Sequence, residues 1–257
     1  MNLPINAPLR LIKHPSGAAE IVIDRPERHN AMTIPMYEAL LALIAECGQD
    51  PAVRCILFRG AGGKSFISGT DITHFKDFRD GRDGVTYEAL VERVIDAVER
   101  IAVPTVAVID GWAVGGGLVL ATACDFRICS EASRFGAPIA KTLSNTVSSR
   151  NMARLQTAFG VPRVKKMLML ADYVAAPEAL ACGYVYEVCE KDALEQAGHT
   201  LAQRLVALSP VTQKAVKESL RRIVVEQSLD DEDLIEEVYG STRFRDAVTA
   251  FTAGSSK

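Results

Sequence analysis

The chain has 257 residues, 48% of them hydrophobic and 24% charged, and a formal net charge of −3. These proportions are typical of an ordinary globular protein with one large domain or a core and an appendage. The small net charge gives no case for nucleic acid or an anionic membrane. No apolar run approaches the roughly 20 residues of a membrane-spanning helix, and residues 1–15 resemble neither a signal peptide nor a transit peptide.

The cysteines indicate a reducing compartment. Most lie inside apolar runs and none has the spacing of a metal site; they are Cys47, Cys55, Cys124, Cys129, Cys182 and Cys189. This pattern is typical of reduced thiols in the core of a cytoplasmic protein. We therefore expect a cytoplasmic protein without a metal site.

The first half of the chain predicts strands that alternate with helices. Residues 18–24 and 53–59 are short apolar runs of the kind that form strands. Residues 35–47, between them, place apolar side chains at helical spacing, and residues 85–101 form a second amphipathic stripe. A strand–helix–strand order favours a parallel sheet covered by helices, so we expect an α/β fold. Residues 73–84, which include His74, are charged and predict a mobile, solvated surface loop.

A glycine-rich stretch at residues 110–120 follows an apolar strand at 103–109 and leads into an apolar helix. Its glycines, Gly115, Gly116 and Gly117, leave backbone N–H groups uncovered. The helix start adds unpaired N–H groups and the positive end of the helix dipole. Such a turn can hold a phosphate, stabilise a transient oxyanion, or simply allow close packing of helix and strand.

Known phosphate motifs fit this turn poorly. A dinucleotide fingerprint would need a third glycine where the chain has Leu120, and no Walker loop occurs. Residues 66–71, Phe-Ile-Ser-Gly-Thr-Asp, form a second turn of the same kind after a strand. Two such turns can direct two backbone N–H groups at one point, which is what a thioester oxyanion requires.

The second half predicts helix after helix. Short strands are expected at 125–129, 133–136 and 184–188, and helices at 148–159, 162–171, 177–182, 191–207, 210–227, 230–239 and 241–252. We divide the chain into an α/β core, residues 1–190, and a helical C-terminal region, residues 191–257. Lys214, Lys217 and Arg221 share one helical face, which is expected to be solvated or, alternatively, to help bind the phosphates of a nucleotide ligand.

Four blocks of sequence, in order, resemble the enoyl-CoA hydratase/isomerase (crotonase) superfamily. They are residues 24–32, 66–72, 110–120 and 124–136, and residues 209–210 and 242–251 also fit. The resemblance covers nearly the whole chain. It implies a crotonase-like (ββα)-type spiral core, an acyl-CoA substrate that brings its own coenzyme A, and no permanently bound cofactor. It also implies that the helical C-terminal region forms a homotrimer or a dimer of trimers.

The resemblance further implies which residues form the site. The backbone N–H groups of Ser68 and Gly116 would form the oxyanion hole for the thioester carbonyl. The coenzyme A path would be lined by two segments and the start of the glycine turn, that is, by Arg25, Arg28, His29, Ala31, Ser68, Gly69, Thr70, Asp71, Ile72, Gly115 and Gly116.

The chain departs from the family where its hydratases carry two catalytic glutamates, because these positions hold Val119 and Ile139. A positioned acid or base contributes roughly 10²–10⁴-fold to a rate, so hydration has lost its usual proton-transfer groups. Replacements near the pocket could come from polar side chains that otherwise have structural roles, namely His74, Ser144, Asn145, Ser148 and Asn151.

Three functions therefore remain open. The first is a hydratase/isomerase-type enzyme that stabilises a thioester enolate, with unidentified acid and base groups. The second is an acyl-CoA decarboxylase or another enolate-forming lyase, because loss of CO₂ forms the enolate without a base. The third is a non-catalytic acyl-CoA-binding protein. Turnover of crotonyl-CoA against a malonyl-type CoA, together with affinity for acyl-CoA, separates them.

Overall fold

The computed structural model describes residues 8–254, which build two mainly parallel sheets. The larger sheet has the order β1-β2-β3-β5-β7-β10, in which only β1 runs antiparallel to its neighbour. Its strands are β1 (Leu9–Lys13), β2 (Ala18–Ile23), β3 (Cys55–Gly60), β5 (Thr105–Ile109), β7 (Phe126–Ser130) and β10 (Glu187–Cys189).

The smaller sheet has the order β4-β6-β8-β9, and its strands are β4 (Ser65–Ile67), β6 (Trp112–Val114), β8 (Arg134–Gly136) and β9 (Val174–Ala175). Each of β4, β6 and β8 directly follows a strand of the larger sheet in the sequence and precedes a helix. The chain thus repeats a strand–strand–helix unit, which confirms the predicted crotonase-like α/β core.

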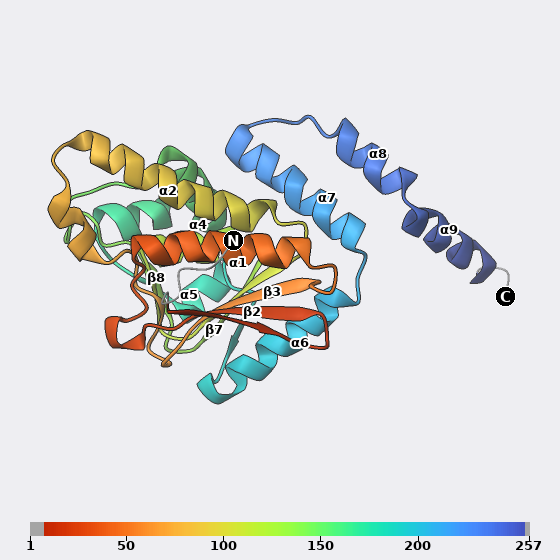
Figure 1. Cartoon of the computed structure of the whole chain (residues 1–257), viewed down its shortest axis with the longest axis horizontal. Helices are drawn as coiled ribbons and strands as arrows, with labels where there is room; N and C mark the ends of the chain where they lie inside the picture. Colours follow the sequence, from red (N-terminus) through yellow and green to blue (C-terminus); the bar gives the residue numbers. More distant parts are fainter. Residues whose placement is uncertain (1–7, 255–257) are drawn as a thin grey trace.

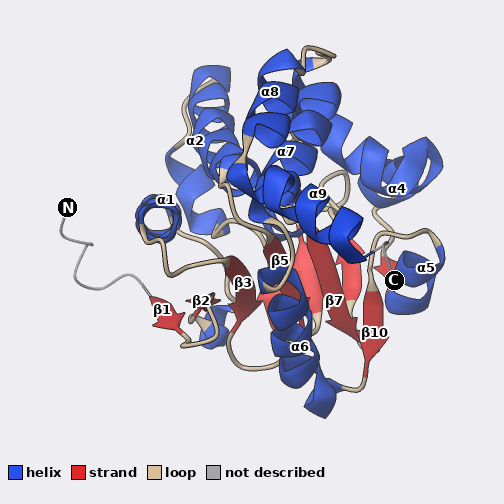
Figure 2. Ribbon diagram, turned by 90° about the vertical axis from the view of Figure 1, so that its right-hand side faces the viewer, coloured by secondary structure: helices blue, strands red, loops and turns tan. Residues whose placement is uncertain are grey.

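Helices cover both faces of the larger sheet (Figures 1 and 2). On one side lie α1 (Ile34–Gln49), α2 (Gly81–Arg100), α3 (Gly116–Ala123) and α4 (Ser149–Met169), which enclose the main apolar core. The other side is covered by α6 (Leu194–Val206), which packs on a smaller apolar cluster that includes Leu57, Val108 and Leu201. The remaining short elements are η1 (Pro26–Arg28), η2 (Ile72–Asp77), α5 (Ala176–Ala181) and η3 (Lys191–Ala193).

The helices after α6 start against α2 and end away from the core (Figure 1). They are α7 (Pro210–Arg221), a turn of π-helix at Arg222–Glu226, α8 (Glu232–Gly240) and α9 (Thr242–Gly254). None of the helices within residues 8–254 has the length and apolar character needed to span a bilayer. The expected division of the chain at residue 190 stays a prediction.

Lys214, Lys217 and Arg221 of α7 were predicted to lie on a solvated face. This prediction is wrong for Lys217 and Arg221. Nζ of Lys217 lies 2.8 Å from Asp125, and only 9% of the Lys217 side chain is exposed. Arg221 is buried and pairs with Glu218 and Glu226. Lys214 pairs with Glu237 at 2.7 Å. All three cations therefore fasten α7 within the chain.

Several local predictions also need correction. Residues 73–84 do not form a loop throughout, because η2 starts at Ile72 and α2 starts at Gly81, where Asp80 and Asp83 form a capping box. The helices expected at 148–159 and 162–171 are joined as α4, which kinks at Gly160. Strands β1, β4, β6 and β9 were not expected, and β4 includes the first two residues of the predicted turn at 66–71, since runs of two to five residues show little periodicity.

Candidate active site

The two glycine turns predicted from the sequence meet in space. They follow β4 and β6, which are parallel neighbours with Ser65 opposite Trp112. A Cβ atom built on Gly69 would lie 3.7 Å from the amide nitrogen of Gly116 and 3.3 Å from the carbonyl oxygen of Val114. The two backbones therefore approach each other closely because no side chain separates them.

Two of these glycines are required by the geometry. Gly69 has φ +102°, a conformation that other residues rarely adopt. A Cβ on Gly117 would lie 2.1 Å from the carbonyl oxygen of Ile67, so only glycine allows the start of α3 to pack on the first turn. Gly116 is the first residue of α3, where N–H groups have no acceptor within the helix. The start of α3 is thereby presented at the contact between the turns.

The two segments predicted to line a coenzyme A path are held together. The N–H of Met32 donates to the carbonyl of Gly69, and the N–H of Asp71 donates to the carbonyl of Met32, both at 2.8 Å. Arg25 donates to Asp71 at 2.7 Å and to the carbonyl of Ala31 at 3.0 Å. The hydrogen bond from Thr73 and then the Arg25 pair lower the pKa of Asp71 to about 2. Figure 1 shows the corresponding loop between β2 and α1.

The remaining residues of these segments differ in exposure. Arg28 and His29 lie exposed at the end of η1, and Ile72 is 61% exposed at the start of η2. Ser68 and Gly115 are half-buried beside the meeting point of the turns. The side chains with charge or large surface thus lie at the rim, while the backbone of the turns forms the interior.

A chain of three hydroxyl groups lies beside the start of α3. Oγ1 of Thr70 is 2.7 Å from the hydroxyl of Tyr37 and 2.5 Å from that of Tyr87. The Tyr37 hydroxyl is also 3.0 Å from the position of a Cβ on Gly116. Burial raises the pKa of both tyrosines, so both stay protonated at neutral pH. The sequence analysis missed both tyrosines, because they occupy ordinary apolar positions on amphipathic helices.

The two positions that the resemblance assigns to the family's glutamates lie in apolar surroundings. Val119 is 2% exposed within α3, and Ile139 packs against the main core. The polar side chains proposed to replace the glutamates lie in different surroundings. Ser148 caps α4 by accepting from the N–H of Asn151, while Ser144 and Asn145 are exposed. The His74 ring packs with Phe78 and Tyr87, next to the hydroxyl chain.

One carboxylate near these groups was also missed. Glu88, from α2, accepts a hydrogen bond of 3.0 Å from the N–H of Ser148, and burial raises its pKa. Its negative charge contributes to the raised pKa of Tyr87. Nothing in the sequence separates Glu88 from Glu92 and Glu99 of the same helix, which instead pair with buried Arg154.

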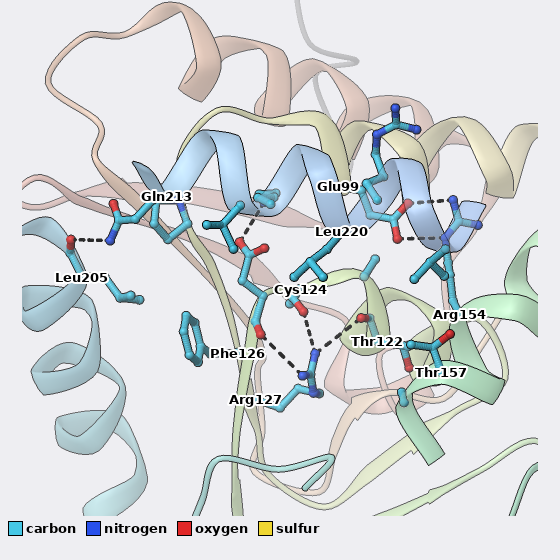
Figure 3. A pocket seen from close by; sticks show the side chains of 18 of the residues that line it. Glu99, Thr122, Cys124, Phe126, Arg127, Arg154, Thr157, Leu205, Gln213 and Leu220 are labelled. Atoms are coloured by element: carbon cyan, nitrogen blue, oxygen red, sulfur yellow. Dashed lines mark hydrogen bonds and ion pairs between the residues drawn. The ribbon is translucent and has the colours of Figure 1, made fainter. Parts of the chain in front are cut away.

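A cavity of about 520 Å³ lies elsewhere, under α7 (Figure 3). Its wall combines apolar side chains such as Phe126 and Leu220 with the ion pair of Glu99 and Arg154. Arg127 points along one wall and donates to the carbonyl of Cys124. No residue of the two glycine turns lines this cavity. We therefore place the candidate site at the turns, where the backbone donors are.

Comparison with known proteins agrees with the fold and the order of the motifs. The enoyl-CoA hydratase/isomerase family model matches residues 13–252. The short-chain-enoyl-CoA hydratase of Clostridium acetobutylicum is 29% identical over 94% of this chain and 93% of its own length. The (E)-benzylidenesuccinyl-CoA hydratase of Thauera aromatica is 30% identical over 78% of this chain and 77% of its own.

Solved structures share the whole fold. An enoyl-CoA hydratase/carnithine racemase from Magnetospirillum magneticum superposes with a TM-score of 0.86, at 27% identity over 99% of this chain and 94% of that one. The resemblance stated from the four sequence blocks is thereby confirmed. The chain belongs to the enoyl-CoA hydratase/isomerase family.

Proposed function

We propose that the chain is an enzyme that hydrates or isomerises an acyl-CoA thioester, with the backbone N–H groups of Ser68 and Gly116 as its oxyanion hole. The observation that carries this proposal is the contact between the two glycine turns, which brings the backbones of Gly69 and Gly116 together. Two donors aimed at one oxygen stabilise the enolate that forms when the thioester carbonyl takes up negative charge. The names of the relatives, hydratases of CoA thioesters, support the same substrate class.

Coenzyme A would follow the joined segments at residues 25–32 and 68–72. Arg28 and His29 are exposed at the rim, where cationic or polar groups can meet phosphates. Arg25 has a different role, because it is already bonded to Asp71 and Ala31 and holds the two segments in register. The coenzyme arrives with the substrate, and we propose no permanently bound cofactor.

The hydroxyl chain offers a route for the proton. When Thr70 accepts from one tyrosine and donates to the other, the three hydroxyl groups leave one O–H free to donate at one end of the chain and a lone pair at the other. Tyr37 would be the end nearest the oxyanion hole, since its hydroxyl lies beside Gly116. The raised pKa keeps both tyrosines protonated, so each carries a proton that it can pass on only as it receives another from its neighbour.

In hydration by this route, the hydroxyl chain takes up one proton and releases one, so it gains no net charge. As water adds its oxygen to Cβ of an enoyl thioester, electrons move into the carbonyl and form an enolate in the oxyanion hole. The proton that the water loses enters the hydroxyl chain, and a proton from the other end of the chain adds to Cα. The hydroxyls of Tyr37, Thr70 and Tyr87 again hold three protons, with their hydrogen bonds reversed until the O–H groups rotate back, so one water molecule supplies both groups.

The two other functions considered from the sequence have less support. The relatives compared above are named as hydratases, and this favours neither a decarboxylase nor a non-catalytic binding protein. Both alternatives remain distinguishable by experiment. A decarboxylase turns over a malonyl-type CoA but not crotonyl-CoA, and a binding protein turns over neither.

The test is turnover of crotonyl-CoA by the wild-type chain and by Gly116→Val. A branched side chain on Gly116 covers the amide and presses on the Tyr37 hydroxyl, which is 3.0 Å from the new Cβ. We expect the rate to fall about 10²-fold or more, the effect of one lost donor. Gly48→Val, at an exposed position of α1 where a Cβ has 3.7 Å to Ile101, is the matched control and should retain activity.

Calorimetry with acetyl-CoA and octanoyl-CoA complements this test. Binding at millimolar ligand or better is expected even when turnover is slow, because the segments that would hold coenzyme A remain. If neither ligand binds, the chain does not act on CoA thioesters. If Gly116→Val is as active as the wild type, the active site lies elsewhere.

A further inference from the structure

Three polar side chains from distant parts of the sequence converge on the far side of the larger sheet, where α6 packs. Nε2 of His14 lies 2.8 Å from Oε1 of Glu20, and Nε2 of His199 lies 3.2 Å from the same oxygen. All three atoms lie within 4.8 Å of one another. His14 follows β1, Glu20 is in β2, and His199 is in α6. None of the three belongs to the proposed active site.

The carboxylate of this cluster is unusual for its position. Glu20 is 2% exposed in a strand whose six residues are all buried. Its other oxygen, Oε2, accepts a hydrogen bond of 2.6 Å from Nε of Arg59. The guanidinium of Arg59 pairs with this buried carboxylate and holds its orientation. A charged oxygen is therefore fixed in place and faces two imidazole nitrogens.

We propose that His14, Glu20 and His199 bind one divalent transition-metal ion of borderline softness, with Zn²⁺ as the representative. Two imidazole nitrogens and a carboxylate oxygen are a common ligand set for such ions. Ligands about 2.0–2.1 Å from a tetrahedral ion lie about 3.3 Å from each other. The distances of 2.8 and 3.2 Å need to change by only a few tenths of an ångström to reach that spacing.

The surroundings complete the site. Arg59 holds Oε2 and leaves Oε1 for the ion, as outer hydrogen bonds orient ligands in metal sites generally. The His14 and His199 side chains are 30% and 25% exposed, so water can supply the fourth ligand. The positive charge of Arg59 opposes the ion, and we therefore expect a micromolar dissociation constant. Bound metal would join the β1–β2 hairpin to α6 and stabilise their contact.

The experiment is equilibrium dialysis of the untagged chain against micromolar ZnCl₂, with bound zinc measured by atomic emission. We expect one zinc per chain and a rise in melting temperature. Glu20→Gln keeps the shape of the side chain and one acceptor oxygen for Arg59 but removes the charged ligand. This variant, His14→Gln and His199→Gln should each weaken binding at least about tenfold, since loss of even an outer partner costs 10–100-fold.

Two controls make the result decisive. His29→Asn changes an exposed histidine at φ 52°, a conformation that asparagine tolerates, and should bind zinc as the wild type does. The absorption spectrum of the Co²⁺ form should show bands of nitrogen and oxygen ligands without thiolate charge transfer. Binding that survives both His14→Gln and His199→Gln, a thiolate spectrum, or no zinc bound by the wild type would overturn the proposal.

Discussion

The hydroxyl groups of Tyr37 and Thr70 lie 2.7 Å apart, which joins the first helix of the fold to the first glycine turn. Thr70→Val keeps the shape of the side chain but interrupts the chain of hydroxyls between Tyr37 and Tyr87. If this chain moves the proton, we expect kcat for crotonyl-CoA hydration to fall about 10²-fold or more, the usual contribution of a positioned proton-transfer group. Thr70→Ser keeps the hydroxyl and should retain most of the activity.

Removing a hydroxyl elsewhere tests whether the effect is local. Tyr37→Phe should match Thr70→Val, whereas Tyr186→Phe loses only a hydrogen bond with Arg204 on an exposed surface and should leave kcat unchanged. Circular dichroism verifies the fold of each variant. Equal activity of Thr70→Val and Thr70→Ser would exclude the hydroxyl chain as the proton route.

Gly117 is predicted to be essential for the packing of the two turns. Gly117→Ala places a methyl group 2.1 Å from the carbonyl oxygen of Ile67, and backbone has to move to relieve the clash. We expect the free energy of unfolding in urea to fall by about 1–3 kcal/mol, the usual cost of overpacking. Gly48→Ala, where a Cβ has ordinary room beside Ile101, should be neutral or stabilising. Equal stability of the two variants would contradict the close contact of the turns.

Asp71 is predicted to stabilise the fold in a pH-dependent way. Its pKa of about 2 in the folded chain is below the unfolded value of about 3.9. The contribution is therefore fully present above about pH 4 and is lost as the pH falls towards 2. We expect Asp71→Asn to cost about 1 kcal/mol at neutral pH, since the pair is partly solvated, about half as much at about pH 3, and little below about pH 2.

The measurement is thermal unfolding of the wild type and Asp71→Asn across this range. Asp77→Asn, which changes an exposed aspartate of η2, corrects for the change in net charge. A difference between wild type and Asp71→Asn that is constant with pH would show that the ionised carboxylate makes no specific contribution.

Introducing glutamates at positions 119 and 139 tests whether carboxylates there would transfer protons in this pocket. Val119→Glu with Ile139→Glu buries two acids, so stability should decrease and their pKa values should rise. If the pocket is otherwise a hydratase site, crotonyl-CoA hydration should increase, by up to about 10²-fold. Val119→Gln with Ile139→Gln has similar size and should lose stability without the gain in rate. Equal rates for the two double variants would mean that these positions do not face the substrate.

Assembly is predicted from exposed apolar side chains in the C-terminal helical region, on its helices and on the loop before α8. Leu220, Leu229 and Tyr239 are 57%, 81% and 61% exposed in the single chain. Large apolar side chains exposed in this number in this region favour an interface between chains. We expect light scattering to give three or six times the chain mass of 27.8 kDa. A monomer at micromolar concentration would contradict the proposed trimer or dimer of trimers.

The sequence by itself determined the fold class and the position of the two glycine turns. These features are local, because a strand, a glycine turn and a helix start follow each other within about ten residues and leave a periodic pattern. The resemblance assigns Val119 and Ile139 to the positions of the family's two glutamates, and this departure and its effect on the reaction stay predictions. Very short strands such as β6 and β9 escaped prediction, because pairing with neighbours rather than local periodicity forms them.

Only the tertiary structure decided which side chains meet. Tyr37 and Thr70 are 33 positions apart, and Thr70 and Tyr87 are 17 apart, on elements that the sequence predicts separately. The convergence of His14 and His199 on Glu20 likewise depends on how α6 lies across the sheet. Lys217, expected on a solvated face, pairs with Asp125 for the same reason. Packing of distant elements brings such groups together, and a local pattern of residue types does not predict that packing.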